Sequence, residues 1–411
     1  MVWTLGKRCS EAQHQLPQSN KKQQAIVLEK YVVVIFGLCS GELVYTSQNI
    51  PKVNFMSSFA VHVLRLNDVT PHPNAERLEL AVVGGYRVVV AKGQFNKNDL
   101  VAYLPEASVL PDTLIEDLGL TGRLAGSHKN RIKAVRLRGE LSQGIVMPAH
   151  PSWGEGDDVA SLLGVEKYTP PIPVALAGEV YVLEDHEVLS FDIENIKKFP
   201  NVLEDGEMVS LTEKLHGTFT MVGAVPPRLA RPESAHKNGR LFVSSKGLMH
   251  QRLGLKANEK NQNNSYFRAL DSSNAWKLVD ELSARLDKPV VLLGETFGQG
   301  IQDLNYNAKT PTFRAFALYI DKTPQSDDVL ERVLNEFGIK RVPVLYKGPF
   351  DMKVVEEFTQ GHETLSGQNT HMREGVVITP LVERVHPTVG RVVLKSVSEQ
   401  YLLRKNATEY N

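Results

Sequence analysis

A proline-rich stretch, YTPPIPVA at residues 168–175, separates two parts of the chain whose hydrophobic patterns differ. Proline removes a backbone donor and disfavours helix in the residue before it, so we expect an extended linker around this stretch, at residues 166–184. Residues 56–165 hold only short β-branched runs that Pro, Asn or Gly separate, which predicts a small β-barrel. The sequence therefore predicts two folded domains that a linker joins.

The part after the linker, residues 185–411, mixes two periodicities and predicts an α+β domain. Residues 265–286 and 327–338 read as helices, the first with one apolar face formed by Trp276, Val279, Leu282 and Leu286. Apolar strands are expected at 289–298, 313–320, 374–380 and 391–397.

Composition narrows the class of protein. Lys and Arg number 47, as do Asp and Glu, so no global charge calls for a polyanionic partner. Cys9 and Cys39 are the two cysteines, which excludes a cysteine zinc cluster and favours an intracellular, reducing compartment. The longest apolar run, residues 31–39, is shorter than the ~20 residues that span a bilayer, so we expect a strand there and no membrane association. Residues 1–55 read as a poorly ordered extension, and an organelle-targeting segment stays open as an alternative.

The stretch TEKLHGTF at residues 212–219 is the first candidate for chemistry. Lys214 follows Glu213 and precedes His216 and Gly217, and a glycine within a strand marks a close approach by another group. Burial and neighbouring cations lower the pKa of a lysine and make it a nucleophile. We therefore expect Lys214 to act covalently beside a bound nucleotide.

Further charged residues interrupt the predicted apolar strands. Glu295 lies inside one strand and Glu374 opens another, and buried carboxylates in such places are paired or bind metal. Two separated carboxylates suit Mg²⁺ or Mn²⁺, which take oxygen ligands. Strand alternation places Arg391, Val393 and Lys395 on one face, and Lys395 could neutralise a phosphate.

The order of these segments resembles that of the covalent nucleotidyltransferases, the superfamily of RNA ligases, DNA ligases and capping enzymes. The β-barrel in front makes the chain similar to the Deinococcus-type, ATP-dependent RNA ligases. The segments that carry the resemblance are EKLHGTF (213–219), SSKGL (244–248), LLGETFG (292–298), FRAFALY (313–319), REGVVI (373–378) and VVLKS (392–396). The resemblance implies an ATP-grasp-like nucleotidyltransferase domain of antiparallel sheets and helices over residues 185–411.

The resemblance also implies roles for individual residues. Lys214 would take AMP from ATP, Lys395 would contact the α-phosphate, and Phe316 would stack on the base. Glu295 would hold the ribose or a metal-bound water, and Glu374 would bind the metal's water shell. The other implied nucleotide contacts are Glu213 and residues 191–199 near the adenine, His216, Gly217, Lys246 and Arg391. Val393 departs from the Lys-x-Lys pattern that the family usually shows, and Arg391 is the candidate to replace that charge.

Two sequence features of the predicted barrel indicate a nucleic-acid partner. TPHPNAERLEL (70–80) is similar to tRNA-binding OB modules of some synthetases. Residues 121–139 hold six Lys or Arg and neither Asp nor Glu, a strip that favours phosphate contacts. From it we expect Arg131, Lys133, Arg136 and Arg138 to bind RNA or a nicked RNA-containing duplex.

These features favour an ATP-dependent RNA ligase that joins 3′-OH and 5′-phosphate ends, at nicks in duplexes, through a lysyl-AMP intermediate, and that acts as a monomer. Two alternatives stay open. A capping-type guanylyltransferase would use GTP, and His216 disfavours it because this residue is typical of nick-sealing RNA ligases. An RNA-binding protein with a decayed ligase domain would explain Val393.

Overall fold

The computed structural model describes residues 24–28, 31–35, 59–169, 176–231, 239–256 and 258–404. Strands β1 (Gln24–Leu28) and β2 (Tyr31–Ile35) pair as an antiparallel hairpin, which confirms a strand at the start of the apolar run. Both cysteines, most of the N-terminal extension and linker residues 170–175 lie outside the described residues. Within the described residues, every helix is too short or too polar to cross a membrane.

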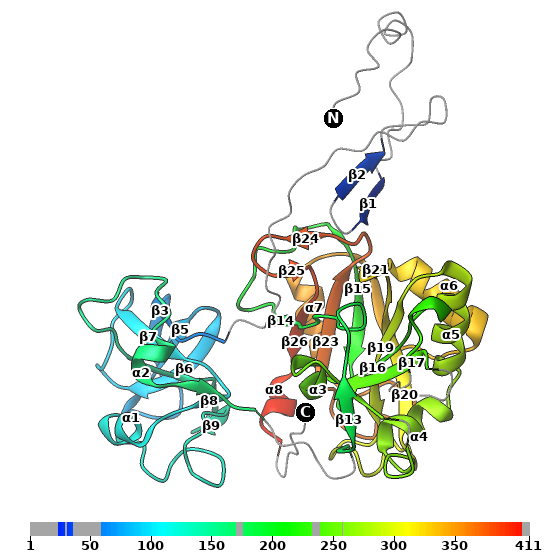
Figure 1. Ribbon diagram of the computed structural model, residues 1–411. Helices are drawn as coiled ribbons and strands as arrows, with labels where there is room; N and C mark the ends of the chain where they lie inside the picture. Colours follow the sequence, from blue (N-terminus) through cyan, green and yellow to red (C-terminus); the bar gives the residue numbers. More distant parts are fainter. Residues whose placement is uncertain are drawn as a thin grey trace, which may run out of the picture. The chain divides into compact units, whose positions relative to one another are not determined.

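Residues 59–169 form the predicted β-barrel (Figure 1). Its strands form the sheets β11-β7-β3, β4-β5-β6, β10-β9 and β12-β8. The elements are β3 (His62–Arg65), β4 (Asp68–Pro71), β5 (Leu78–Val83), β6 (Tyr86–Ala91), β7 (Leu100–Leu104), β8 (Ser108–Val109), α1 (Asp112–Asp117), β9 (Val135–Leu137), β10 (Glu140–Ser142), β11 (Ile145–Pro148), α2 (Ala160–Leu163) and β12 (Glu166–Lys167). The turn between β5 and β6 is Gly84–Gly85, both at positive φ, as a two-residue hairpin with the native strand twist requires.

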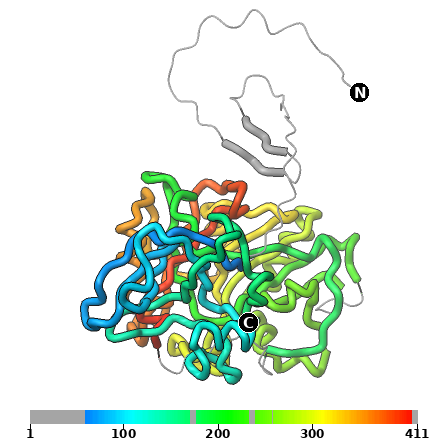
Figure 2. Tube along the Cα trace, turned by 90° about the vertical axis from the view of Figure 1, so that its left-hand side faces the viewer, coloured from blue at the N-terminus to red at the C-terminus, as the bar shows by residue number. Residues whose placement is uncertain are grey.

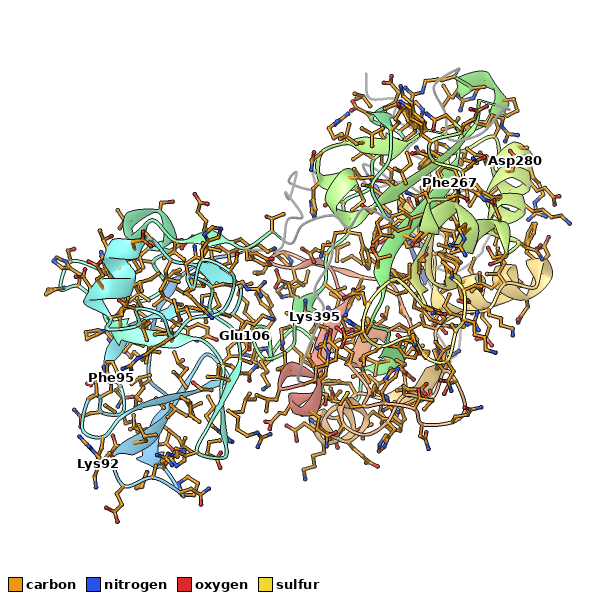
Figure 3. All side chains as sticks on the ribbon, turned by 90° about the horizontal axis from the view of Figure 1, so that it is seen from below. Lys92, Phe95, Glu106, Phe267, Asp280 and Lys395 are labelled. Atoms are coloured by element: carbon orange, nitrogen blue, oxygen red, sulfur yellow. The ribbon has the colours of Figure 1, made fainter. Side chains whose placement is uncertain are left out.

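The barrel has a well-formed interior that follows from strand alternation. Ala81 and Val83 on β5 and Val88 and Val90 on β6 are buried together. A second apolar cluster covers the other side of β7, through Ala102 and Leu104, and includes residues of α1 and α2. Figure 3 labels Phe95, which is buried in the first cluster, and the exposed Lys92 beside it in sequence.

The C-terminal part contains two five-stranded sheets. The first has the order β14-β26-β23-β15-β22, and the second has the order β17-β16-β19-β20-β21. The strands of the first sheet are β14 (Glu194–Asn195), β15 (Met208–Lys214), β22 (Val344–Pro349), β23 (Gly375–Pro380) and β26 (Leu394–Val397). Those of the second sheet are β16 (Thr218–Ala224), β17 (Leu241–Ser245), β19 (Val290–Phe297), β20 (Thr312–Ile320) and β21 (Thr323–Pro324). Pairing is antiparallel except between β14 and β26, whose parallel pairing brings residues 394–395 beside residues 194–195 (Figure 1). Figure 2 follows the same chain trace from the side.

Helices cover the outer faces of both sheets. Helices α5 (Ala275–Leu286) and α6 (Asp327–Phe337) pack on the second sheet, and α7 (Met352–Thr359) packs on the first. The remaining elements are β13 (Val180–Val182), η1 (Pro227–Leu229), α3 (Lys246–His250), β18 (Leu253–Leu255), α4 (Ser265–Asp271), β24 (Val385–His386), β25 (Gly390–Arg391) and α8 (Glu399–Leu402). Phe267 on α4 and Asp280 on α5 mark these helices in Figure 3.

The single helix predicted at 265–286 is wrong, because α4 and α5 are separate. The break falls at residues 272–274, where the hydroxyls of Ser272 and Ser273 donate to backbone carbonyls of the preceding turn and so compete with the helix. The Asn274 side chain donates to the Phe337 carbonyl at the end of α6. Val279 and Leu282 are buried as expected, whereas Leu286 at the helix end is 40% exposed. The helix predicted at 327–338 is confirmed, and Gly338 ends it in the left-handed conformation.

Candidate active site

The connection between the two sheets holds the predicted nucleophile. Strand β15 ends at Lys214 in the first sheet, and β16 starts at Thr218 in the second. Alternation along β15 turns Ser210, Thr212 and Lys214 toward a cleft of about 1150 Å³, and buries Leu211 against α7. The sequence 215–217 therefore crosses from one sheet to the other at the edge of this cleft.

Lys214 and Glu374 form an ion pair in the cleft. Strand β23 pairs with β15 so that Gly375 lies opposite Lys214, and Glu374, just before it, reaches Lys214 Nζ at 2.5 Å. Burial lowers the pKa of Lys214, but Glu374 and Glu295 outweigh burial, so its pKa is raised. The prediction of a lowered pKa for Lys214 is therefore wrong for the protein without nucleotide, because carboxylates and not cations lie nearest to its amine.

Gly217 confirms the close approach that its position in the sequence suggests, and the approaching group is protein backbone. A Cβ atom at Gly217 would lie 2.3 Å from the carbonyl oxygen of Thr296 and 2.9 Å from Cγ of Glu295. The glycine thus lets β19 approach the 215–217 connection, and so brings Glu295 close to Lys214.

Glu295 lies on the cleft face of β19. Val291 and Leu293 share that face, whereas Val290 and Leu292 pack under α5. Burial, followed by the neighbouring Glu374, raises the pKa of Glu295 to about 8, although Lys214 opposes the shift. The carboxyl group therefore binds a proton more tightly than an exposed glutamate does.

Two more lysines lie in the same cleft. Lys395 projects from β26 opposite Val377, and Figure 3 labels it. Burial, followed by Lys246 and Lys214, lowers the pKa of Lys395 to about 8. Lys246 follows the α3 N-cap Ser245 and pairs with Asp192 at 2.7 Å. Three ammonium groups around one cleft favour an anionic ligand such as a polyphosphate.

Arg391 is a poor substitute for the lysine that Val393 replaces. Its guanidinium pairs with Glu383, with Nε 2.8 Å from Oε2, and also donates to the Tyr319 hydroxyl at 3.1 Å. Arg391, Val393 and Lys395 all line the cleft, as the predicted alternation implies. The charge of Arg391 is nevertheless already compensated by Glu383.

Phe316 belongs to an aromatic cluster within the cleft. Its ring stacks on Phe191 with centroids 5.6 Å apart, and Phe219 packs against both rings. Phe191 lies in the segment 191–199 that was expected near the adenine, but the sequence alone did not single it out. The cluster offers aromatic faces on which a planar base can stack.

The predicted nucleotide contact Glu213 directs its carboxylate away from Lys214. Alternation places it on the face of β15 opposite to Lys214, where it is buried and accepts hydrogen bonds from the Thr364 amide at 2.9 Å and hydroxyl at 2.6 Å. Burial raises the pKa of Glu213 despite these bonds. Glu213 borders the cleft, but its carboxylate anchors a loop, so a side-chain contact with adenine is not supported.

His216 brings in residues that the sequence analysis missed. Its ring contacts Asp303 at 2.8 Å and Tyr401 at 2.8 Å, and its amide donates to the Tyr306 hydroxyl at 2.6 Å. Arg404 in turn bonds Asp303 at 2.9 Å. These partners lie 87 to 188 residues from His216, and no local sequence pattern joins them to it.

The cleft gathers every individually predicted residue of the C-terminal part and, of the predicted segment 191–199, residues 191–193, but none of the predicted residues of the barrel. Its lining includes Glu213, Lys214, His216, Gly217, Lys246, Glu295, Phe316, Glu374, Arg391 and Lys395. Glu295 and Glu374 form a two-carboxylate donor set, and no larger cluster of metal-ligating side chains occurs among the described residues. Two carboxylates fit Mg²⁺, which keeps several waters and takes phosphate oxygens as further ligands.

The four basic residues of the barrel differ in their surroundings. The Arg131 guanidinium packs over the Tyr168 ring at 4.0 Å, and Lys133 is partly buried. Arg136 and Arg138 are exposed on the β9–β10 hairpin, where Arg136 donates to the Gly139 carbonyl at 2.8 Å. Arg131 therefore has a packing role, and Arg136 and Arg138 are the accessible cations.

Comparisons with known proteins identify the domains. Residues 207–397 match the family model described as RNA ligase, and residues 60–149 match one described as an OB-fold domain. No curated protein sequence matches the chain. These matches make the C-terminal part an RNA ligase domain. They confirm the predicted α+β fold class, the OB-type barrel in front of the ligase domain, and the assignment to the ligase enzymes.

Solved structures of Naegleria gruberi RNA ligase have a similar fold. The structure of one variant with ATP and Mn is 22% identical in sequence to this chain and has a TM-score of 0.68. The match covers 84% of this chain and 98% of the Naegleria chain. The structure of a variant with AMP and Mn is 23% identical, and the match covers 84% of this chain and 98% of the Naegleria chain with a TM-score of 0.68. The same ligase with PPi is 23% identical, with 84% and 97% coverage and a TM-score of 0.66. At these identities the likeness shows the shared fold.

Proposed function

We propose that this chain is an ATP-dependent RNA ligase that seals 3′-OH and 5′-phosphate ends at nicks through a lysyl-AMP intermediate. The observation that carries the proposal is the convergence of Lys214, Glu295, Glu374 and Lys395 in one cleft, from four different strands or strand ends. The RNA ligase match over residues 207–397 and the ATP, AMP and PPi named for the Naegleria structures support it.

In the first step, the Lys214 amine attacks the α-phosphorus of ATP. A P–N bond forms, the bond to the pyrophosphate oxygen breaks, and Lys214 gives up its proton. The raised pKa of Lys214 means that the amine must first leave its ion pair with Glu374. Lys395 and Lys246 are placed to neutralise phosphate oxygens, and the Phe316 cluster to hold the base.

Mg²⁺ or Mn²⁺ would be held by Glu295 and Glu374 and would supply positive charge to the phosphates. The pKa of about 8 at Glu295 fits this role, because a carboxyl group in such an environment ionises fully only when a cation is near. The two later steps move AMP to the RNA 5′-phosphate and then release it as the 3′-OH attacks. Both involve phosphoryl oxygens that the same lysines can reach.

The domains would divide the work. We propose an OB-fold that extends to residue 169, because β12 pairs with β8, and a ligase domain that includes β13, which pairs with β18. Both ends of the expected linker 166–184 therefore belong to the folded domains, and residues 1–55 are left unassigned. RNA or a nicked RNA-containing duplex is the proposed substrate, a monomer the proposed state, and an intracellular, reducing compartment the proposed location. Exposed Arg136 and Arg138 are the proposed phosphate contacts of the barrel.

The test is incubation of the full chain with α-³²P-labelled ATP or GTP and Mg²⁺, followed by a chase with nicked duplexes. We expect label on the protein from ATP and transfer of the label to nicks with an RNA 3′-OH end. Preference for GTP would indicate a capping enzyme. Binding of RNA without any covalent label would support the alternative of a decayed ligase domain, which Val393 suggests.

A further inference from the structure

The connection 215–217, which follows the proposed nucleophile, is held by residues that the proposed mechanism does not use. Gln302 donates to the Gly217 carbonyl, Asp303 contacts the His216 ring and the Tyr306 hydroxyl accepts from the His216 amide. All three belong to the loop after β19. From the other side, Tyr401 of α8 and Arg404 after it reach the same histidine.

The contacts of the His216 ring determine where its proton lies. Nε2 is 2.8 Å from Asp303 Oδ1, and an ionised carboxylate accepts but does not donate, so Nε2 carries the hydrogen. Nδ1 is 2.8 Å from the Tyr401 hydroxyl, which then donates to it. Arg404 lies 3.3 Å from Nε2, but its strong bond runs from Nε to Asp303 Oδ2 at 2.9 Å. Asp303 and Tyr401 therefore favour a single neutral tautomer of His216.

The tautomer of His216 affects the ion pair between Lys214 and Glu374. His216 Nδ1 lies 3.8 Å from Glu374 Oε2, whereas Lys214 holds Glu374 Oε1 at 2.5 Å. With the Tyr401 hydroxyl donating to Nδ1, no His216 proton faces Glu374, and the carboxylate keeps its orientation toward Lys214. The Tyr401 ring packs edge-on to His216 at 5.3 Å, and the Arg404 guanidinium lies 3.8 Å over the Tyr401 ring. Ring orientation is therefore set from two sides.

We propose that Asp303, Tyr401 and Arg404 are positioning residues, which fix the tautomer and orientation of His216 and thereby the placement of Lys214 and Glu374 for transfer of AMP. The inference rests on the proposed function for its kinetic consequence. The arrangement itself rests only on the contacts around His216. It predicts that Tyr401, which also lines the cleft, and Arg404 affect the chemical step through His216.

The most informative variant is Tyr401→Phe, because it keeps the ring and removes one hydroxyl. We expect the single-turnover rate of lysyl-AMP formation at saturating ATP to fall roughly tenfold, since small misplacement of reacting groups is costly, while KM for ATP stays within about twofold. Tyr346→Phe is the matched control, because that hydroxyl donates to the Pro349 carbonyl within β22 and Tyr346 does not line the cleft. For Arg404, replacement by Lys should retain more of the rate than replacement by Ala.

A double-variant comparison tests whether Tyr401 acts through His216. In a His216→Ala background, Tyr401→Phe should cause little further loss, because alanine offers no side-chain acceptor for the Tyr401 hydroxyl. Independent, additive losses for the two substitutions would overturn the proposal. So would a Tyr401→Phe defect confined to KM, or unchanged kinetics in Tyr401→Phe.

A spectroscopic measurement separates this proposal from the proposed function. With ¹⁵N-histidine labelling of the full chain, and His216→Asn to assign the signal, His216 should show a protonated Nε2 and an accepting Nδ1. Tyr401→Phe should shift the Nδ1 signal, and Tyr346→Phe should not. An unshifted signal would overturn the positioning role even in an active ligase. A shifted signal in a chain that forms no lysyl-AMP would instead leave the contact network intact and reject the proposed function.

Discussion

Lys214 Nζ and Glu374 Oε1 lie 2.5 Å apart although 160 residues separate them in the chain. The register of β15 and β23, which sets Lys214 opposite Gly375, produces this contact. The pair keeps Lys214 in its ammonium form, since Glu374 helps to raise its pKa. In the proposed reaction the Lys214 amine leaves this pair, and a divalent ion bound to Glu374 would favour that release.

The first prediction concerns Lys214 itself. Lys214→Ala should give no labelled protein with α-³²P-ATP and Mg²⁺, because no other amine takes its place at the end of β15. Lys277→Ala is the matched control, as Lys277 is an exposed lysine of α5 that should not affect labelling. Labelling of Lys214→Ala at the level of the unaltered chain would show that the attachment site is elsewhere.

The second prediction concerns Glu374 and Lys395, which flank Lys214. Alanine at either position should slow lysyl-AMP formation by ~10²-fold or more, the usual scale for removal of a preorganised charge. Thermal unfolding of each variant should show a folded protein, since neither residue belongs to an apolar cluster. Losses of less than a few-fold at both positions would contradict the metal and phosphate roles.

Lys395 also predicts a pH dependence. Burial, together with Lys246 and Lys214, lowers the pKa of Lys395 to about 8. A bound phosphate favours the protonated amine, so affinity should be greatest below pH 8 and should fall as the pH rises above 8, where the free protein loses this proton. Binding of α,β-methylene ATP, which cannot transfer AMP, measures the effect.

The control for this pH dependence is Lys395→Arg, because arginine stays charged over the whole range. Its affinity for the analogue can be lower throughout, but the decline above pH 8 should disappear. If the decline persists unchanged in Lys395→Arg, another group is responsible for it.

How far the sequence predicted this site depends on the range of the interactions. Lys214, Glu295, Glu374 and Lys395 were found because charged residues stand out in apolar strands, and strand order then placed them together. The carboxylate of Glu213 was misplaced, although strand alternation from Lys214 would have turned it away from the cleft. Asp303, Tyr401 and Arg404 were missed because only tertiary packing brings them to His216.

The fold shows the same distinction. The barrel and the strands of the ligase domain followed from β-branched runs and their period of two, a signal that lies within each segment. The break between α4 and α5 did not, because apolar spacing continues across it, while Ser273 bonds to the Leu270 carbonyl and Asn274 to the distant Phe337 carbonyl. The pKa of Lys214 likewise depended on which distant charges lie nearest, and these are Glu374 and Glu295 rather than cations.

The fourth prediction concerns the aromatic cluster. Phe316→Ala should weaken ATP binding roughly 5- to 150-fold, the range that corresponds to loss of ~1–3 kcal/mol of base stacking. KM for ATP in lysyl-AMP formation is the measurement. Phe267→Ala, in α4, is the control, since this side chain packs on Trp276 outside the cleft. An equal rise in KM for both variants would point to general destabilisation instead of stacking.

The last prediction separates the barrel from the ligase domain in the proposed reaction. Arg136 and Arg138 are exposed on the β9–β10 hairpin, whereas Arg131 packs on Tyr168 and should be left in place. Arg136→Gln with Arg138→Asn removes two charges, and asparagine suits the positive φ of position 138. Binding to a nicked duplex should weaken, and the slope of log K against log salt should become shallower by about one for each phosphate that the barrel no longer neutralises.

The matched control is Lys92→Gln with Lys97→Gln, which removes the same charge from exposed positions elsewhere on the barrel. Lysyl-AMP formation should be unchanged in both double variants, because the first step uses ATP alone. If the control flattens the salt dependence as much as the hairpin variant does, then the overall charge of the barrel attracts the duplex and the hairpin does not contact it. If neither variant changes nick binding, the β9–β10 hairpin is not the phosphate contact that we propose.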